Sequence, residues 1–361
     1  MFFTVSRLPD PRLPEHENIG TWWFSHDAGW SCNGTEWSKG YIGNHLHIKW
    51  NNNQIQFEHD LTRCFPLWWD KDSHTLTNFL GSGQRVWADK TIAIVDGQLV
   101  TAAVDIVGEI NPSELTMNQA VDAISRCLIQ KAAGLLHPSK LFVTGGVDTL
   151  TLLALVKHVG LPCQLLDYEH FEYDEFTNQN IVDLRKQHWA YNQIHHWREP
   201  TTLISGAYGD EFLFRGPHNI ALWAAWHDID LIQLLKSATG YHVGYFRKLE
   251  NEVIFCQAFN QRADIKAAYP TYKDLVHKII DTNANDFQHC HLGNTITWTP
   301  FKDPELTKIV LRLNQQDLLD HILDATVNRQ IIARLYPTVL NLLSATKNQD
   351  SRQYLHMLND I

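Results

Sequence analysis

The stretch that decides the fold of this chain is LFVTGGVDTLTLLALVKHV, residues 141–159. An apolar run, Leu141–Val143, precedes the turn Thr144–Thr149, and an amphipathic stretch follows from Leu150 to Val159. This order predicts a strand, a tight turn and a helix. Glycines let the backbone approach an anion closely, and the amides of a helix N-terminus add partial positive charge. The turn is therefore predicted to bind phosphate.

The residue order of this turn differs from two common phosphate loops. It has no Lys before the hydroxyl residue, as the Walker loop requires, and it does not follow the dinucleotide pattern G-x-G-x-x-G. Taken alone, the turn also fits an ordinary glycine-rich connection between a strand and a helix. Other motifs must decide between these readings.

Two further stretches have related features. Ser205–Phe214 (SGAYGDEFLF) again follows an apolar run, Thr202–Ile204, and again places small residues beside an acid. The stretch TPFKDPEL, residues 299–306, places Asp303 as a predicted helix N-cap and Pro304 as the first helical residue.

In this order, the three motifs resemble those of asparagine synthetases and β-lactam synthetases. The first is similar to the pyrophosphate loop S-G-G-x-D-S of ATP pyrophosphatases, with Thr in place of both outer Ser residues. The second resembles S-G-x-G-x-D-E-L-F and the third V-P-F-L-D. The resemblance covers about residues 115 to 350. It implies an ATP-dependent, AMP-forming ligase that adenylates a carboxylate, releases pyrophosphate and transfers the acyl group to ammonia or an amine.

The resemblance also implies the cofactor-binding residues. Asp148 and Asp210 match the acids that hold Mg²⁺ in the family, which suits an ion that prefers carboxylate and water ligands. Ser205 and Gly206 match residues that contact adenosine and adenylate, while the strand ends match residues near adenine. The residues implied to contact ATP are Phe142, Thr144, Gly145, Gly146, Val147, Asp148, Thr149, Leu166, Ser205 and Gly206. The simpler use of either Asp is as an N-cap or first-turn acid.

Two candidate catalytic residues follow from the same comparison. Arg334, Pro337 and Lys347 reproduce a family pattern in which the Lys stabilises the transition state and the leaving phosphate. Tyr208 fits either an acid–base role on the substrate or simple packing, and the sequence leaves both open. Ala207 stands where asparagine synthetases have an acid, so the carboxylate substrate is not assigned.

The predicted fold class is α/β. Residues 113–361 are expected to form a parallel-sheet synthetase domain resembling the adenine-nucleotide α-hydrolases, preceded by a β-rich domain at residues 1–112. A capping box at Thr116 and Gln119 predicts a helix from about residue 117. A strand at Cys163–Leu166, a helix at Thr177–Trp189 and further helices beyond residue 300 continue the pattern.

In the first domain, Asp96-Gly97 predicts a hairpin turn. The segment DLTRCFPLWW, Asp60–Trp69, resembles a strand pair of the class II glutamine amidotransferases, which have an Ntn-type fold. Their chemistry requires an N-terminal Cys that becomes exposed when Met is removed, and position 2 here is Phe2. A degenerate domain without glutaminase activity is therefore expected.

Composition limits the partners. The chain has 361 residues, with Lys+Arg 30 against Asp+Glu 40 and a net charge of −10, which disfavours nucleic acid and favours small-molecule or peptide substrates. The six cysteines are scattered and are predicted to be reduced core thiols. The first residues do not read as a signal peptide and no apolar run of 18 occurs, so a cytoplasmic protein without membrane association is expected. The oligomeric state is not fixed by the sequence, and a homodimer is retained as one arrangement.

Two other functions stay open beside the amide-forming ligase. One keeps the adenylation step but modifies a nucleobase or a peptide. The other is a catalytically inactive nucleotide-binding protein, which the Thr-for-Ser changes, Ala207 and the missing N-terminal Cys motivate.

Overall fold

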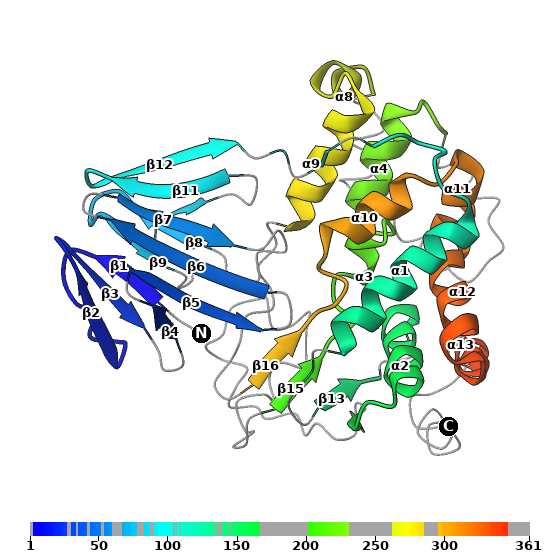
Figure 1. Cartoon of the computed structure of the whole chain (residues 1–361). Coiled ribbons are helices and arrows are strands. Elements are labelled where there is room, and N and C mark those ends of the chain that lie inside the picture. The colour runs from blue at the N-terminus through cyan, green and yellow to red at the C-terminus, as the bar shows by residue number, and fades with distance from the viewer. Residues whose placement is uncertain are drawn as a thin grey trace, which may run out of the picture. The chain divides into compact units, whose positions relative to one another are not determined.

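The computed structural model describes residues 3–26, 30–33, 35–41, 44–51, 54–59, 67–77, 83–86, 90–103, 105, 107–108, 110–133, 135, 139–143, 146–166, 201–230, 262–284 and 295–345. They form two compact units, one with the strands of residues 3–103 and one with the elements from residue 110 onward (Figure 1). The boundary between the units lies after residue 106, whereas the sequence predicted it after residue 112.

The first unit contains two antiparallel sheets of six strands each. One has the order β10-β8-β9-β1-β3-β2, with bounds β1 Phe3–Ser6, β2 Glu15–Ile19, β3 Trp22–His26, β8 Leu67–Asp70, β9 Thr75–Thr77 and β10 Gln84–Val86. The other has the order β12-β11-β7-β6-β5-β4, with bounds β4 Ser31–Asn33, β5 Glu36–Tyr41, β6 Asn44–Asn51, β7 Gln54–His59, β11 Lys90–Val95 and β12 Gln98–Ala103.

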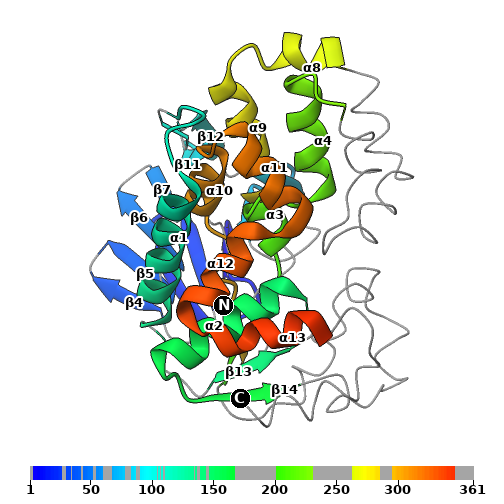
Figure 2. The same ribbon diagram turned by 90° about the vertical axis from the view of Figure 1, so that its right-hand side faces the viewer.

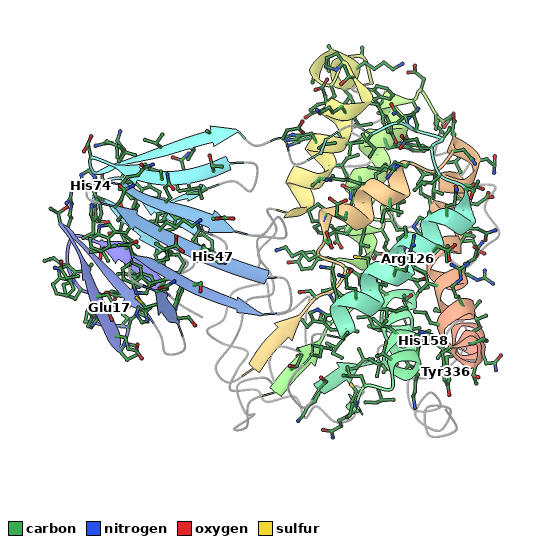
Figure 3. All side chains as sticks on the ribbon, viewed as in Figure 1. Glu17, His47, His74, Arg126, His158 and Tyr336 are labelled. Atoms are coloured by element: carbon green, nitrogen blue, oxygen red, sulfur yellow. The ribbon has the colours of Figure 1, made fainter. Side chains whose placement is uncertain are left out.

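Apolar side chains from both sheets form one core. Residues two positions apart on a strand face the same side of the sheet. Leu46 and Ile48 on β6 are such a pair, and both are buried in this core. Phe3 of the first sheet stacks on Phe57 of the second, with ring centroids 6.5 Å apart. Side chains accordingly crowd between the strands of this unit in Figure 3. The predicted β-rich half is a two-layered sandwich in the residues that the structure describes.

The hairpin turn predicted at Asp96-Gly97 is confirmed. Val95 pairs with Gln98, and the two residues between them have φ values of 49° and 80°. Two successive positive φ angles define a type I′ turn, for which Asp-Gly is a favoured sequence.

The second unit is built on a four-stranded sheet of order β14-β13-β15-β16, with every neighbouring pair parallel. Its strands are β13 Ser139–Phe142, β14 Cys163–Leu166, β15 Thr201–Ile204 and β16 Thr295–Trp298. The described helices are α1 Met117–Ala132, α2 Val147–Val159, α3 Gly209–Phe212, α4 Pro217–Trp226, α8 Arg262–Ala268, α9 Tyr272–Ala284, α10 Pro304–Leu311, α11 Gln315–Asp324, α12 Thr326–Leu335, the 3-10 turn η5 Pro337–Val339 and α13 Leu340–Ala345. The mixed α/β class with a parallel sheet is thus confirmed, while the helix predicted at Thr177–Trp189 lies outside the described residues.

Local helix signals of the sequence are confirmed. Thr116 caps α1, since its hydroxyl accepts from the Gln119 amide at 3.4 Å and its own amide donates to the Gln119 side chain at 2.9 Å. Asp303 caps α10 by accepting from the Glu305 amide at 2.9 Å, and Pro304 is the first helical residue.

Helix α2 differs from its prediction. It was expected to be amphipathic, but residues 149–156 are all buried. The helix packs on β13 and against α1, α12 and α13, which Figure 2 shows beside it. At its end, His158 bonds the Leu335 carbonyl at 3.1 Å, and Figure 3 labels His158 close to Tyr336. A helix covered on all sides needs apolar residues all round, which removes the polar face.

The prediction of core cysteines is wrong for Cys32, which is exposed on the edge strand β4. Cys127 and Cys163 are partly buried. Burial raises the pKa of both Cys127 and Cys163 to about 12, so these two thiols stay protonated at neutral pH. Cys64, Cys256 and Cys290 lie outside the described residues. None of the helices described is long and apolar enough to span a membrane.

Candidate functional site

The candidate site lies at the carboxyl ends of β13 and β15, which are neighbours in the parallel sheet. From β13 the next strand in sequence, β14, lies toward one edge of the sheet. From β15 the next strand, β16, lies toward the opposite edge. Such a reversal of strand order opens a crevice in which open α/β sheets bind ligands. The strands end in register, because Leu141 pairs with Ile204, and so the two glycine-rich motifs begin side by side.

The first motif leads into the N-terminus of α2. Gly146 is the N-cap residue and has no side chain to accept hydrogen bonds from the first amides of the helix. Those amides and the helix dipole make this end of α2 suited to an anion. The Thr149 hydroxyl donates to the Gly146 carbonyl at 2.9 Å. Thr144 and Gly145, also predicted to bind ATP, lie outside the described residues.

Two glycines of the second motif allow it to touch the first. A Cβ added at Gly206 would lie 2.8 Å from Cγ2 and 3.0 Å from the amide nitrogen of Thr149. A Cβ added at Gly209 would overlap the carboxyl group of Asp148. The close approach of the two loops therefore requires glycine at both positions.

Ser205 and Tyr208 hold the second loop in its shape. The Ser205 amide donates to the Trp298 carbonyl at 2.9 Å, and its hydroxyl accepts from the Ala207 amide at 3.2 Å. Tyr208 has a φ of 66°, which is uncommon for a residue with a side chain and recurs at functional sites.

The Tyr208 side chain is buried. Its ring meets Phe212 edge-on with centroids 6.3 Å apart, and Nζ of Lys302 lies 5.1 Å from its centroid. Lys302 is itself buried and stands where the family motif has Leu. These contacts are compatible with the packing role that the sequence left open for Tyr208.

Asp148 and Asp210 are brought together by an arginine that the sequence analysis missed. Nη2 of Arg215 donates to Oδ1 of Asp148, and Nη1 lies 2.9 Å from Oδ1 of Asp210. The Arg215 side chain is 2% exposed, against 16% for Asp148 and 40% for Asp210. Asn328 of α12 adds a hydrogen bond of 3.2 Å to the same Oδ1 of Asp148. We call Asp148, Asp210 and Arg215 the charge triad.

The charge triad carries one positive and two negative charges when its members are ionised. Burial raises the pKa of Asp148 to about 6, and the negative charge of Asp210 acts in the same direction. Arg215 and Asn328 oppose this shift without cancelling it. A carboxylate whose pKa is raised by burial and by a neighbouring negative charge is typical of functional sites.

Short helix α3, which carries Asp210, is fixed by buried side chains from elsewhere in the unit. Its last carbonyls, at residues 211–213, accept hydrogen bonds from Asn219 at 2.9 Å, Thr307 at 2.8 Å and His321 at 2.6 Å. The Val327 amide donates to Nδ1 of His321 at 3.2 Å, so Nε2 carries the proton and donates a hydrogen bond to the Leu213 carbonyl. Asp210 is therefore held on a rigid support.

The fit of the site to Mg²⁺ is incomplete. The two predicted carboxylates lie together, but they are joined by a guanidinium. The residues that the structure describes hold no group of three or more His, Cys, Asp or Glu side chains that suits a metal. As described, the charge triad does not offer an open site to a divalent ion between its carboxylates.

The other predicted residues have different outcomes. The backbones of Phe142 and Leu166 pair across β13 and β14, so Phe142 ends a strand that borders the crevice, whereas Leu166 lies one strand further from it. Arg334 forms an ion pair with Asp122 on α1, away from the charge triad. Lys347 lies outside the described residues.

Sequence reasoning missed Arg215, Asn328, His321 and Lys302. Arg215 follows the second motif directly and is its nearest basic residue, which was an available signal. Lys302 lies within the third motif, residues 299–306, but was not singled out there, whereas Asn328 and His321 come from α12 and α11, whose sequences give no hint of the site. No family model matches this chain, and no curated protein matches it.

Proposed function

We propose that this protein is an ATP-dependent, AMP-forming carbon–nitrogen ligase. The observation that carries the proposal is the meeting of two glycine-rich loops at the point where strand order reverses, with Asp148 and Asp210 joined across them. The predicted motifs could have ended far apart in space. Their convergence is what a nucleotide site between β13 and β15 requires.

In this proposal the phosphates of ATP lie at the N-terminus of α2, where the amides after Gly146 face the anion. The adenosine lies toward Ser205 and Gly206, and adenine lies by the ends of β13 and β14. A substrate carboxylate attacks the α-phosphorus, pyrophosphate leaves, and an acyl-adenylate forms. Ammonia or an amine then attacks the acyl carbon and AMP is released.

The chain's own contribution is positioning and positive charge. The glycines at 206 and 209 fix the two loops against each other, and the helix dipole of α2 offsets the charge of the departing pyrophosphate. Lys347 supplies a cation at the α-phosphorus. Lys302, buried beside Tyr208, is a second cation at the same end of the sheet.

The same proposal includes the fold type of each unit. The four parallel strands and their helices form an adenine-nucleotide α-hydrolase-type domain. The two antiparallel sheets form the central layers of an Ntn-type domain that has lost glutaminase activity. Glutamine should accordingly yield no glutamate while the ligase is turning over.

The experiment is interception of the acyl-adenylate with hydroxylamine. Protein, ATP and Mg²⁺ are incubated with a panel of small-molecule and peptide carboxylates, and acyl-hydroxamate is measured together with AMP. The expected result is equimolar hydroxamate and AMP for at least one carboxylate. Gly209→Ala serves as the matched control, because its loop cannot approach Asp148 in the same way. Hydroxamate formation without AMP would contradict the proposal.

A nucleotide-binding protein without catalysis is the second candidate, and Arg215 is the observation in its favour. A guanidinium that occupies both carboxylates leaves them less able to act on a nucleotide. This candidate predicts that ATP binds but that neither AMP nor ADP accumulates with any carboxylate.

A further inference from the structure

We infer that Arg215 is the resident cation of the charge triad, occupying the position between Asp148 and Asp210 that the family resemblance gives to Mg²⁺. The two carboxylates therefore do not bind a divalent cation together while Arg215 is present. This inference rests on the proposed function only in taking the crevice as a nucleotide site. The metal-binding prediction itself depends on the ion pairs alone.

The guanidinium of Arg215 contacts both carboxylates at once, with one terminal nitrogen for each Oδ1 atom. Asp148 Oδ1 also accepts from Asn328 at 3.2 Å. A divalent ion placed between the carboxylates would have to displace the guanidinium from that position, and Mg²⁺ demands near-octahedral oxygen ligands. The guanidinium, with its donors in a fixed fork, excludes that arrangement.

The positive charge of Arg215 also opposes the binding of a divalent ion. Without Arg215 the two carboxylates would present two negative charges to that ion. With Arg215 the triad carries one net negative charge, and the positive centre lies between the oxygens where the metal would approach. Charges this close interact strongly where water is scarce.

Release of Arg215 from the two carboxylates is unfavourable. Its side chain is 2% exposed, so release would break two ion pairs of a buried guanidinium. Breaking a buried pair in this way is strongly unfavourable. The backbone is also fixed, because the amides of Arg215 and Gly216 donate to the Asp210 carbonyl at 2.5 and 2.6 Å. Arg215 therefore stays, and it acts as a positioning residue for both carboxylates.

A consequence follows for the nucleotide. Any Mg²⁺ in the reaction would be held by the phosphates of ATP and at most by one carboxylate, Asp210, whose side chain is 40% exposed. Asp148 would have a supporting role in the charge triad rather than a metal-ligand role.

The test is Mn²⁺ binding to the full chain without nucleotide, measured by electron paramagnetic resonance. The variants are wild type, Arg215→Met, Arg215→Lys and the double variant Arg215→Met with Asp148→Asn. Wild type is expected to show no stoichiometric site tighter than about 1 mM, whereas Arg215→Met should bind one Mn²⁺ at least about tenfold more tightly. The double variant should lose that gain, and Arg215→Lys, which keeps the positive charge without the fork, should bind Mn²⁺ more weakly than Arg215→Met.

Tight Mn²⁺ binding by wild type that Asp148→Asn and Asp210→Asn each abolish would overturn the inference, and so would unchanged binding in a folded Arg215→Met. If Arg215→Met does not fold, the wild-type, Asp148→Asn and Asp210→Asn measurements decide alone. Failure of the proposed function is distinguishable, since it is scored by acyl-adenylate formation in wild type. That result does not enter the metal titration.

Discussion

The two units of this protein each contain a largely buried aspartate paired with an arginine, and the pKa values of the two aspartates are shifted in opposite directions. In the first unit, Asp10 is 7% exposed and binds Arg12, which is 55% exposed. Hydrogen bonds from Arg12, together with one from Thr4, hold the pKa of Asp10 at about 2. In the second unit, burial and the neighbouring Asp210 raise the pKa of Asp148 to about 6, although Arg215 contacts it.

The difference lies in what each arginine must serve. Arg12 is two positions from Asp10, remains largely in water and neutralises one carboxylate. Arg215 comes from a motif 67 positions away, is buried and is shared between two carboxylates. The first pair stabilises its unit, while the second leaves excess negative charge in a crevice. Proteins keep such unfavourable charge where function needs it.

The largest effect is expected from a cation outside the charge triad. Because the triad already has excess negative charge, ATP can react there only with further positive charge, which Lys347 supplies in the proposed mechanism. Lys347→Ala should lower AMP formation by about 10²–10³-fold and leave ATP affinity within a few-fold, since the contact matters in the transition state. Rates and ATP titration calorimetry measure the two effects. Normal turnover would remove Lys347 from the mechanism and direct attention to Lys302.

Removing one carboxylate of the charge triad should have the next largest effect. Asp148→Asn and Asp210→Asn should each lower AMP formation by at least about a hundredfold, because each disturbs the charge and placement of the loops around the reacting phosphate. The matched control is Asp10→Asn in the first unit, which should leave turnover per folded molecule unchanged. Near-normal rates for either triad variant would show that its carboxylate is structural only.

The comparison predicts opposite effects of pH on stability. Asp10 has a lowered pKa in the fold, so its contribution of about 2 kcal/mol is present above pH 4 and is lost as the pH falls through about 2. Asp10→Asn should remove that contribution at neutral pH. Asp148 has a raised pKa, so ionising it costs stability as the pH rises from about 4 through 6. Urea unfolding across this range, with each Asn variant, measures both; equal signs would contradict the comparison.

The smallest of the predicted effects concerns the contact between loops. Gly209→Ala should lower AMP formation by at least about tenfold, because its methyl group would displace the Asp148 carboxyl and misplace the reacting groups. Gly160→Ala is a suitable control, since that glycine has open space around it but a positive φ of 64° and should affect stability alone. Equal losses in the two variants would argue against a specific contact.

Local features of this fold could be predicted, because their signals lie within a few residues. The capping box at Thr116, the N-cap at Asp303 and the turn at Asp96-Gly97 each depend on neighbours in sequence. The helix after the glycine turn was predicted too, but not the burial of all its residues from 149 to 156. That burial depends on α1, α12 and α13, which no local pattern around α2 describes.

The candidate site shows the same limit. The motifs predicted Asp148 and Asp210, and strand order brings them together. Arg215 was missed because its partner Asp148 is distant in sequence, and Asn328 and His321 reach the site from α12 and α11. Side chains that support a site across the fold carry no spacing signal. Their role is read only from the contacts.

Whether this crevice splits ATP between its α and β phosphates can be read from the products formed from ATP labelled at the α-phosphorus. Wild-type protein is incubated with Mg²⁺, the carboxylate panel and an amine. We expect labelled AMP and an equal amount of pyrophosphate, in amounts that depend on which carboxylate is present. Labelled ADP with inorganic phosphate would contradict the account, and bound but unreacted ATP under every condition would favour the protein without catalysis.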